Sequence, residues 1–181
     1  SIGELWGVAF CISYRSLAQS QRAGLDEARA SLSDALAIAR RSGDLTITHQ
    51  VLYSLGLVAQ LQGDHAQAAA AFAEGLELCL ALGDRVNVGY FIKGIAELTA
   101  LHLEGQRGVR LLGAAHTLME ATGVPFQRDD PGGRWHEQLA DRLRAALGDG
   151  AFAAALSAGA TLSLGQTHHE AQELGRRLAA Q

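Results

Sequence analysis

The stretch GDHAQAAAAFAEGLELCLALGD, residues 63–84, begins and ends with the same Gly-Asp pair. Between the pairs, small and apolar residues recur with the spacing of one face of an α-helix, and this face comprises Ala68, Phe72, Gly75, Leu76 and Cys79. A glycine tolerates the left-handed conformation that ends many helices, and an aspartate after it can accept hydrogen bonds from the free N–H groups of the next helix. The stretch therefore predicts one helix with a turn at each end.

A repeat of 40 residues surrounds this helix. The glycines that mark the repeat are Gly3, Gly43, Gly83 and Gly123. Large apolar residues keep the same spacing at Leu32, Phe72 and Leu112, and small residues keep it at Ala35, Gly75 and Ala115. Such a period is typical of helical solenoids, and forty residues hold two helices of about four to five turns each. The predicted repeats are residues 3–42, 43–82 and 83–122.

In this division the two Gly-Asp pairs are not equivalent. The pair at 83–84 is the junction between units, whereas the pair at 63–64 is a turn inside a unit, with looser counterparts at Ala23-Gly24 and Leu103-Glu104. Small residues such as Gly56 and Ala68 would let the two helices of a unit approach closely. Phe72 would then fill the space toward the next unit, and we expect its truncation to be costly.

The repeat ends at the segment GVPFQRDDPGGRW, which predicts a loop over residues 123–133 because it is rich in glycine and proline. Three shorter helices are predicted after it, at 134–147, 149–158 and 163–179, and together they form a candidate cap over residues 134–181. The small, apolar run AFAAALSAGA suits a buried helix. Ser163 and Gln166 have the spacing of a capping box.

Composition excludes several classes of protein. The chain has a net charge of -4 and is 48% hydrophobic, which argues for a packed core and against a nucleic-acid-binding face in this segment. Cys11 and Cys79 are too few for a disulfide framework and lie in apolar helical contexts, so we expect buried, reduced thiols. Neither a membrane-spanning run nor a signal peptide is evident in the sequence, and we expect a cytoplasmic location.

Catalytic and metal-binding patterns are weak. There is no phosphate-binding loop and no nucleophile elbow, and His136-Glu137 lacks the second histidine of a zinc-protease motif. His168, His169 and Glu170 are adjacent, but zinc needs three or four converging ligands, and a solvated helix face is the favoured interpretation. His116 replaces the leucines of earlier units and is either a satisfied core histidine or, as we favour, a sign that this helix is less covered. We expect no catalysis, no cofactor and no metal.

Residues 52–75 resemble the tetratricopeptide repeat. The matching residues are Leu52, Leu55, Gly56, Ala59, Ala68, Phe72 and Gly75, although the period is 40 and not the usual 34. The resemblance implies an all-α, right-handed superhelix in which the first helix of each unit lines the concave face. On that basis the candidate binding residues are Ser13 in the first unit, Gln50, Tyr53 and Gln60 in the second, and Tyr90, Lys93 and Glu97 in the third. The alternative is that each of these is an ordinary surface or packing residue.

The runs RGVRLLGAAHTLMEATGVPF and RAALGDGAFAAALSAGATLSL are similar to the C-terminal helical region of large bacterial LuxR-type and SARP-type transcriptional regulators. The similarity departs at Thr167 and at His168-His169, which puts the packing of the last helix in question. It implies that the chain is a fragment of a longer regulator with an ATPase module and a helix-turn-helix elsewhere. The expected function is a sensor or interaction module that binds a protein, a peptide or a small effector. The alternative is a self-association module that forms a homo-oligomer; no membrane or nucleic-acid partner is expected for this segment.

Overall fold

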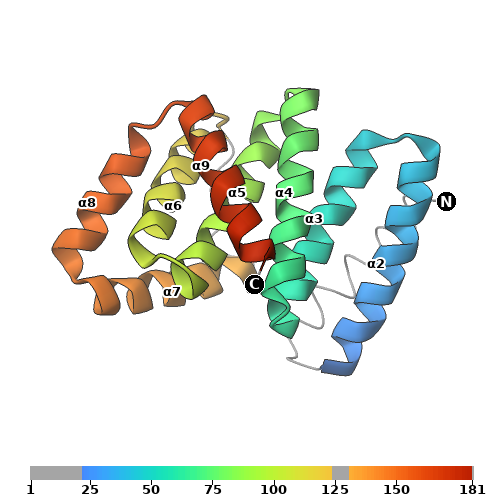
Figure 1. Ribbon diagram of the computed structural model, residues 1–181, viewed down its shortest axis with the longest axis horizontal. Coiled ribbons are helices and arrows are strands. Elements are labelled where there is room, and N and C mark those ends of the chain that lie inside the picture. Colours follow the sequence, from blue (N-terminus) through green and yellow to red (C-terminus); the bar gives the residue numbers. More distant parts are fainter. Residues whose placement is uncertain (1–21, 124–130, 181) are drawn as a thin grey trace.

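The computed structural model describes residues 22–123 and 131–180, and within them it contains only helices and turns (Figure 1). The helices are α2 (Arg22–Ser42), α3 (Leu45–Gln62), α4 (His65–Leu82), α5 (Arg85–His102), α6 (Gly105–Glu120), α7 (Pro131–Leu147), α8 (Asp149–Ala160) and α9 (Leu164–Ala179). The predicted all-α class is therefore confirmed for the described residues. The predicted first helix of the first unit lies outside them.

The turns before α4 and α5 share one geometry. Gly63 and Gly83 both have left-handed backbones, with φ of 80° and 70°. Asp64 and Asp84 each accept a hydrogen bond of 3.1 Å from the backbone N–H three residues later. The prediction that the two Gly-Asp pairs differ is thus wrong at the level of the backbone, because ending one helix and capping the next makes the same local demand at either place. The turn geometry returns every 20 residues, since Asp44, Asp64 and Asp84 are successive N-caps, and the period of 40 belongs to the side chains.

The two looser turns have different outcomes. Ala23-Gly24 lies inside α2, so the predicted turn there is wrong. Leu103-Glu104 does separate α5 from α6, but the Glu104 side chain makes no capping hydrogen bond. It forms an ion pair with Arg177 of α9 instead.

Neighbouring helices approach closely where glycine faces an aromatic ring. A methyl group on Gly56 of α3 or on Gly94 of α5 would overlap with the ring of Phe72 of α4. One on Gly75 of α4 would overlap with the ring of Phe91 of α5. Phe72 and Phe91 are both fully buried, so each ring fills the volume that a glycine leaves open. The predicted role of Phe72 in linking successive helix pairs is confirmed by these contacts.

The segment after α6 differs from the predicted cap in two respects. Helix α7 begins at Pro131, inside the predicted loop over 123–133. Helix α8 buries only one face, formed by Phe152, Ala155 and Gly159, so the prediction of a buried helix is wrong. It packs on α6 at the end of the array (Figure 1), and its small outward residues have no further layer to meet among the described helices.

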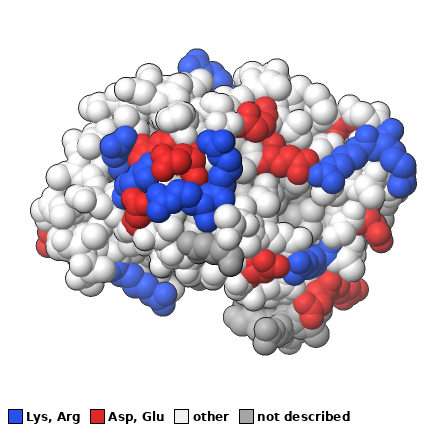
Figure 2. All heavy atoms as spheres, in the orientation of Figure 1, with Lys and Arg blue, Asp and Glu red and all other residues white. Residues whose placement is uncertain are grey.

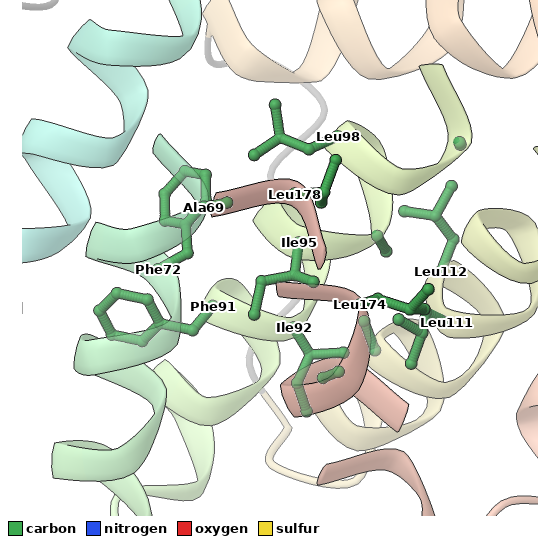
Figure 3. Close-up of a cluster of buried hydrophobic side chains, with 14 of the residues drawn as sticks. Ala69, Phe72, Phe91, Ile92, Ile95, Leu98, Leu111, Leu112, Leu174 and Leu178 are labelled. Atoms are coloured by element: carbon green, nitrogen blue, oxygen red, sulfur yellow. The ribbon is translucent and has the colours of Figure 1, made fainter. Parts of the chain in front are cut away.

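Helix α9 turns back over the array. It begins with the predicted capping box between Ser163 and Gln166 and then packs on α4, α5 and α6, crossing in front of α5 in Figure 1. Leu174 and Leu178 of α9 lie beside Ile95 and Leu98 of α5 in the largest core cluster (Figure 3). Thr167, where the family similarity departs, is buried and donates a hydrogen bond to the carbonyl of Ser163 at 2.9 Å. The helix is therefore part of the core and not an addition to its end.

A candidate binding face on α3 and α5

One side of α3 carries a stripe of half-buried residues that includes Gln50, Tyr53 and Gln60. These three lie on one face because their spacing of three and seven residues corresponds to about one and two helical turns. On α5, Tyr90 and Lys93 occupy the positions 40 residues after Gln50 and Tyr53, and both are also half-buried. The two stripes meet, because the ring centroids of Tyr53 and Tyr90 are 5.9 Å apart. The structure thus places five of the seven predicted residues on adjacent stripes of two helices.

The stripe lies away from α9. A Cβ atom on Gly175 of α9 would lie 3.7 Å from Ile95 of α5, and at 3.6 residues per turn Ile95 and Tyr90 point roughly 140° apart around the helix. Helices α3 and α5 also contact each other directly. Terminal helix α9 therefore covers one side of α5 and leaves the Tyr90 side to other neighbours.

Tyr53 is part of the packing between helix pairs. Its ring centroid is 5.5 Å from that of Phe91 and 5.9 Å from that of Phe72, both fully buried. Aromatic pairs at these separations add to the energy of burial. The packing interpretation of Tyr53, which the sequence left open, is supported, while its partial exposure keeps it within reach of a bound molecule.

Glu97 is a correction to the predicted face. It was expected to be exposed, but its side chain is 3% exposed and lies 2.8 Å from the ammonium of Lys93, which is 12% exposed. A carboxylate can occupy such a position because a paired, opposite charge offsets much of the cost of leaving water. Lys93 therefore neutralises a buried acid as well as bordering the face. Ser13 lies outside the described residues.

Gln60 contributes a polar atom that the fold does not satisfy. Its Oε1 is shielded from solvent and accepts no hydrogen bond from any described residue. Buried side-chain oxygens without a partner are uncommon in folded proteins. The face thus offers an acceptor, two tyrosine rings and a paired lysine, which suits recognition of a polar, partly apolar ligand.

The opposite side of the molecule carries an ion network. Arg107 of α6 binds Glu170 and Glu173 of α9, at 3.2 and 2.9 Å, and Arg110 binds Glu170 at 2.6 Å. Figure 2 shows the interspersed acidic and basic side chains as a patch over these helices. The hydrogen bonds from Arg107 lower the pKa of Glu173. These charges are paired with each other and fasten α9 to α6.

The histidines near this network are not arranged as a metal site. His168 Nε2 lies 2.8 Å from a carboxylate oxygen of Glu77 on α4, and Glu170, whose side chain is only 6% exposed, is paired with two arginines. The interpretation of residues 168–170 as a solvated face is therefore wrong for Glu170, because α9 folds back and buries it. His116 is 53% exposed, which confirms that α6 is less covered there.

A second group of side chains was not anticipated. His49 of α3, Cys79 of α4 and Asp84 at the N-cap of α5 each offer a ligand atom, and these atoms lie within 4.8 Å of one another. Burial lowers the pKa of His49, partly offset by the carboxylates of Asp84 and Asp44. Burial, with a smaller contribution from Asp84, raises the pKa of Cys79 to about 12. The predicted buried, reduced state of Cys79 is confirmed, whereas Cys11 lies outside the described residues.

A pocket of about 240 Å³ lies beside this group. Its lining residues come from four helices and the turn before α5, and are Cys79, Leu80, Gly83, Arg85, Val88, Leu118 and Leu164. The lining is mostly apolar, with Arg85 as its charged member. Sequence spacing alone could not reveal the group, since His49 is 30 residues from Cys79; the available signal was that Cys79 and Asp84 flank one helix junction.

Comparison with protein-family models, curated proteins and solved structures finds no match to the chain. Within the described helices, no stretch combines the length and the apolar character that crossing a membrane requires.

Proposed function

We propose that the chain is a binding module in which the face formed by α3 and α5 holds a peptide or a small effector. The array is a tetratricopeptide-like, right-handed superhelix with 40-residue repeats, and the module performs no catalysis of its own. The observation that carries this proposal is the contact between the half-buried stripes of α3 and α5, with Tyr53 and Tyr90 side by side.

Three features of the face support a binding role. Tyrosines are favoured anchors in interfaces because they combine apolar area with a hydrogen-bonding group. The unsatisfied Oε1 of Gln60 supplies an acceptor for a backbone or side-chain donor. The aromatic contacts of Tyr53 with the core hold the face in shape before a ligand arrives, which reduces the ordering cost of binding.

The proposal can be tested by panning a phage-displayed library of random peptides against the purified chain and measuring the affinity of an enriched peptide. Tyr90→Ala should weaken that peptide at least tenfold, the usual effect of removing an aromatic anchor. His169→Ala is the matched control, because His169 is exposed on α9, away from this face, and it should bind normally. Absence of any enriched peptide, or affinity that is insensitive to Tyr90→Ala, would contradict the assignment.

Tyr53→Ala and Lys93→Ala are poor probes of the face. Tyr53 packs on Phe72 and Phe91, and removal of Lys93 would leave the buried carboxylate of Glu97 without its 2.8 Å partner. Both changes would disturb the fold, so lost binding would not be specific. Tyr53→Phe and Gln60→Ala preserve the packing and test the polar atoms alone.

We further propose that the module belongs to a bacterial transcriptional regulator of the LuxR or SARP type. This rests on the sequence similarity of residues 107–126 and 144–164 to the helical region of such regulators. The surrounding reading frame is the test: a phosphate-binding loop upstream and a helix-turn-helix downstream are expected, and a frame with neither would overturn it.

A further inference from the structure

We propose that His49, Cys79 and Asp84 form a binding site for a divalent transition-metal ion, with Zn²⁺ as the preferred ion. The site joins α3, α4 and the N-cap of α5, and it is independent of the peptide-binding role. None of the family similarities predicts it.

The imidazole of His49 is the observation that points to a ligand. Its side chain is 1% exposed, and both Nδ1 and Nε2 lack a hydrogen-bond partner among the described residues. Its nearest carboxylate oxygen, Asp84 Oδ2, is 3.6 Å from Nε2, which is too long for a hydrogen bond. Leaving a buried polar side chain without partners is costly, and a metal ion between the imidazole and the carboxylate would remove that cost.

The donor set matches the chemistry of zinc. Zn²⁺ binds imidazole nitrogen and carboxylate oxygen at about 2.0–2.2 Å and thiolate sulfur at about 2.3 Å. The three donor atoms already lie within 4.8 Å of one another, so small side-chain rotations bring them to a common centre. Three protein ligands leave a fourth position for water or another ligand, and soft thiolate favours zinc over magnesium or calcium.

The carboxylate is held in place by the helix that it caps. Oδ1 of Asp84 accepts a hydrogen bond from the backbone N–H of Asn87 at 3.1 Å, and Oδ2 accepts one from the Asn87 side chain at 2.7 Å. Such supporting hydrogen bonds orient metal ligands and strengthen binding. Oδ2 retains a second lone pair that faces His49.

The fold provides a route to the site. The pocket of about 240 Å³ includes Cys79 in its lining and carries Arg85 as its charged residue. The metal-free thiol is protonated, so its proton passes to the buffer when the metal–sulfur bond forms. The ring of His49 also meets Phe91 edge to face, with centroids 6.4 Å apart, so the bound ion would tie the junction of α3, α4 and α5 to the aromatic core.

The test uses the full chain prepared without a histidine tag and stripped with a chelator. Titration with Co²⁺ should give thiolate-to-cobalt charge-transfer absorption that saturates at one ion per chain, and Zn²⁺ should displace the cobalt. Cys79→Ser should abolish the charge-transfer band. Cys11→Ser is the matched control and should keep it. His49→Gln and Asp84→Asn should each raise the Kd for Zn²⁺ by about 10-fold or more, and Asp84→Asn preserves the helix cap.

X-ray absorption of the zinc-loaded wild-type chain provides a readout that needs no variant. One sulfur at about 2.3 Å together with nitrogen and oxygen at about 2.0–2.2 Å is expected. A zinc ion without a sulfur ligand, a cobalt band that survives Cys79→Ser, or no ion retained by the wild-type chain would each overturn the proposal.

Discussion

Phe72 lies between two glycines on neighbouring helices, Gly56 of α3 and Gly94 of α5, and is fully buried. Its ring therefore connects one helix pair to the next, and no described side chain can move easily into the space that it occupies. We expect Phe72→Ala to lower the free energy of unfolding by about 3–5 kcal/mol, the range for aromatic residues removed from well-packed cores. Urea denaturation would measure this. Leu61→Ala is the control, since Leu61 is 37% exposed; a loss no larger than the control's would contradict the role of Phe72.

His49 should make the stability of the metal-free chain depend on pH. Burial holds its folded-state pKa below the ordinary value, which is about 6.5 in an unfolded chain. As the pH falls, the unfolded chain therefore takes up the proton first. The free energy of unfolding should be highest above about pH 6.5, decrease as the pH falls below it, and level off below the folded-state pKa.

Urea midpoints between about pH 7.5 and 5, measured with a chelator present, would show this dependence. His49→Leu should lose part of the dependence, because it removes the titrating group. His116→Gln should retain it, since His116 is 53% exposed. A His49→Leu profile parallel to that of the wild type would rule out the assignment.

At the scale of elements, α6 and α8 touch through their backbones. A methyl group on Gly159 of α8 would overlap with the carbonyl of Arg110 of α6, and one on Gly113 of α6 would overlap with the carbonyl of Leu156 of α8. Backbone atoms cannot swing away as a side chain can. The two glycines therefore set how closely the last described layer packs on the array.

Gly159→Ala should destabilise the chain by about 1–3 kcal/mol, because the added methyl forces the helices apart. Gly165→Ala is the matched control: it lies in α9 with no atom within 4 Å of the added carbon, and it should be neutral or stabilising by up to about 1 kcal/mol. Thermal denaturation of the two variants would compare them. Equal melting temperatures would show that α8 does not pack on α6 in this way.

At the scale of the molecule, α9 covers the side of the array that α4, α5 and α6 leave open. Leu174 and Leu178 are fully buried there, and burying each such side chain contributes about 1.5–3 kcal/mol. A chain ending at Leu162 should melt on the order of 10 °C lower and bind a hydrophobic dye. An unchanged melting curve would mean that the array does not need α9.

The same helix decides which surfaces remain for partners. The predicted self-association strip on the terminal helix is not present, since the apolar side of α9 faces the core; the other predicted strip, over residues 3–20, lies outside the described residues. Light scattering at several concentrations distinguishes a monomeric binding module from a self-associating one.

The sequence by itself determined the helices, the capped turns and the glycine positions where helices approach. It could do so because helical periodicity, the Gly-Asp cap and the match of a glycine with an aromatic ring act over short distances along the chain. It also placed Gln50, Tyr53, Tyr90 and Lys93 on matching stripes, because the 40-residue register repeats their position.

The tertiary structure alone decided the rest. The return of α9 over α5 depends on which apolar surface is left uncovered after the array has formed, and no local pattern in residues 164–179 records that. The burial of Glu97 depends on its ion pair with Lys93 and on its surroundings, not on its own spacing. His49, Cys79 and Asp84 meet because three helices cross at one junction, and residues far apart along a chain become neighbours only through such packing.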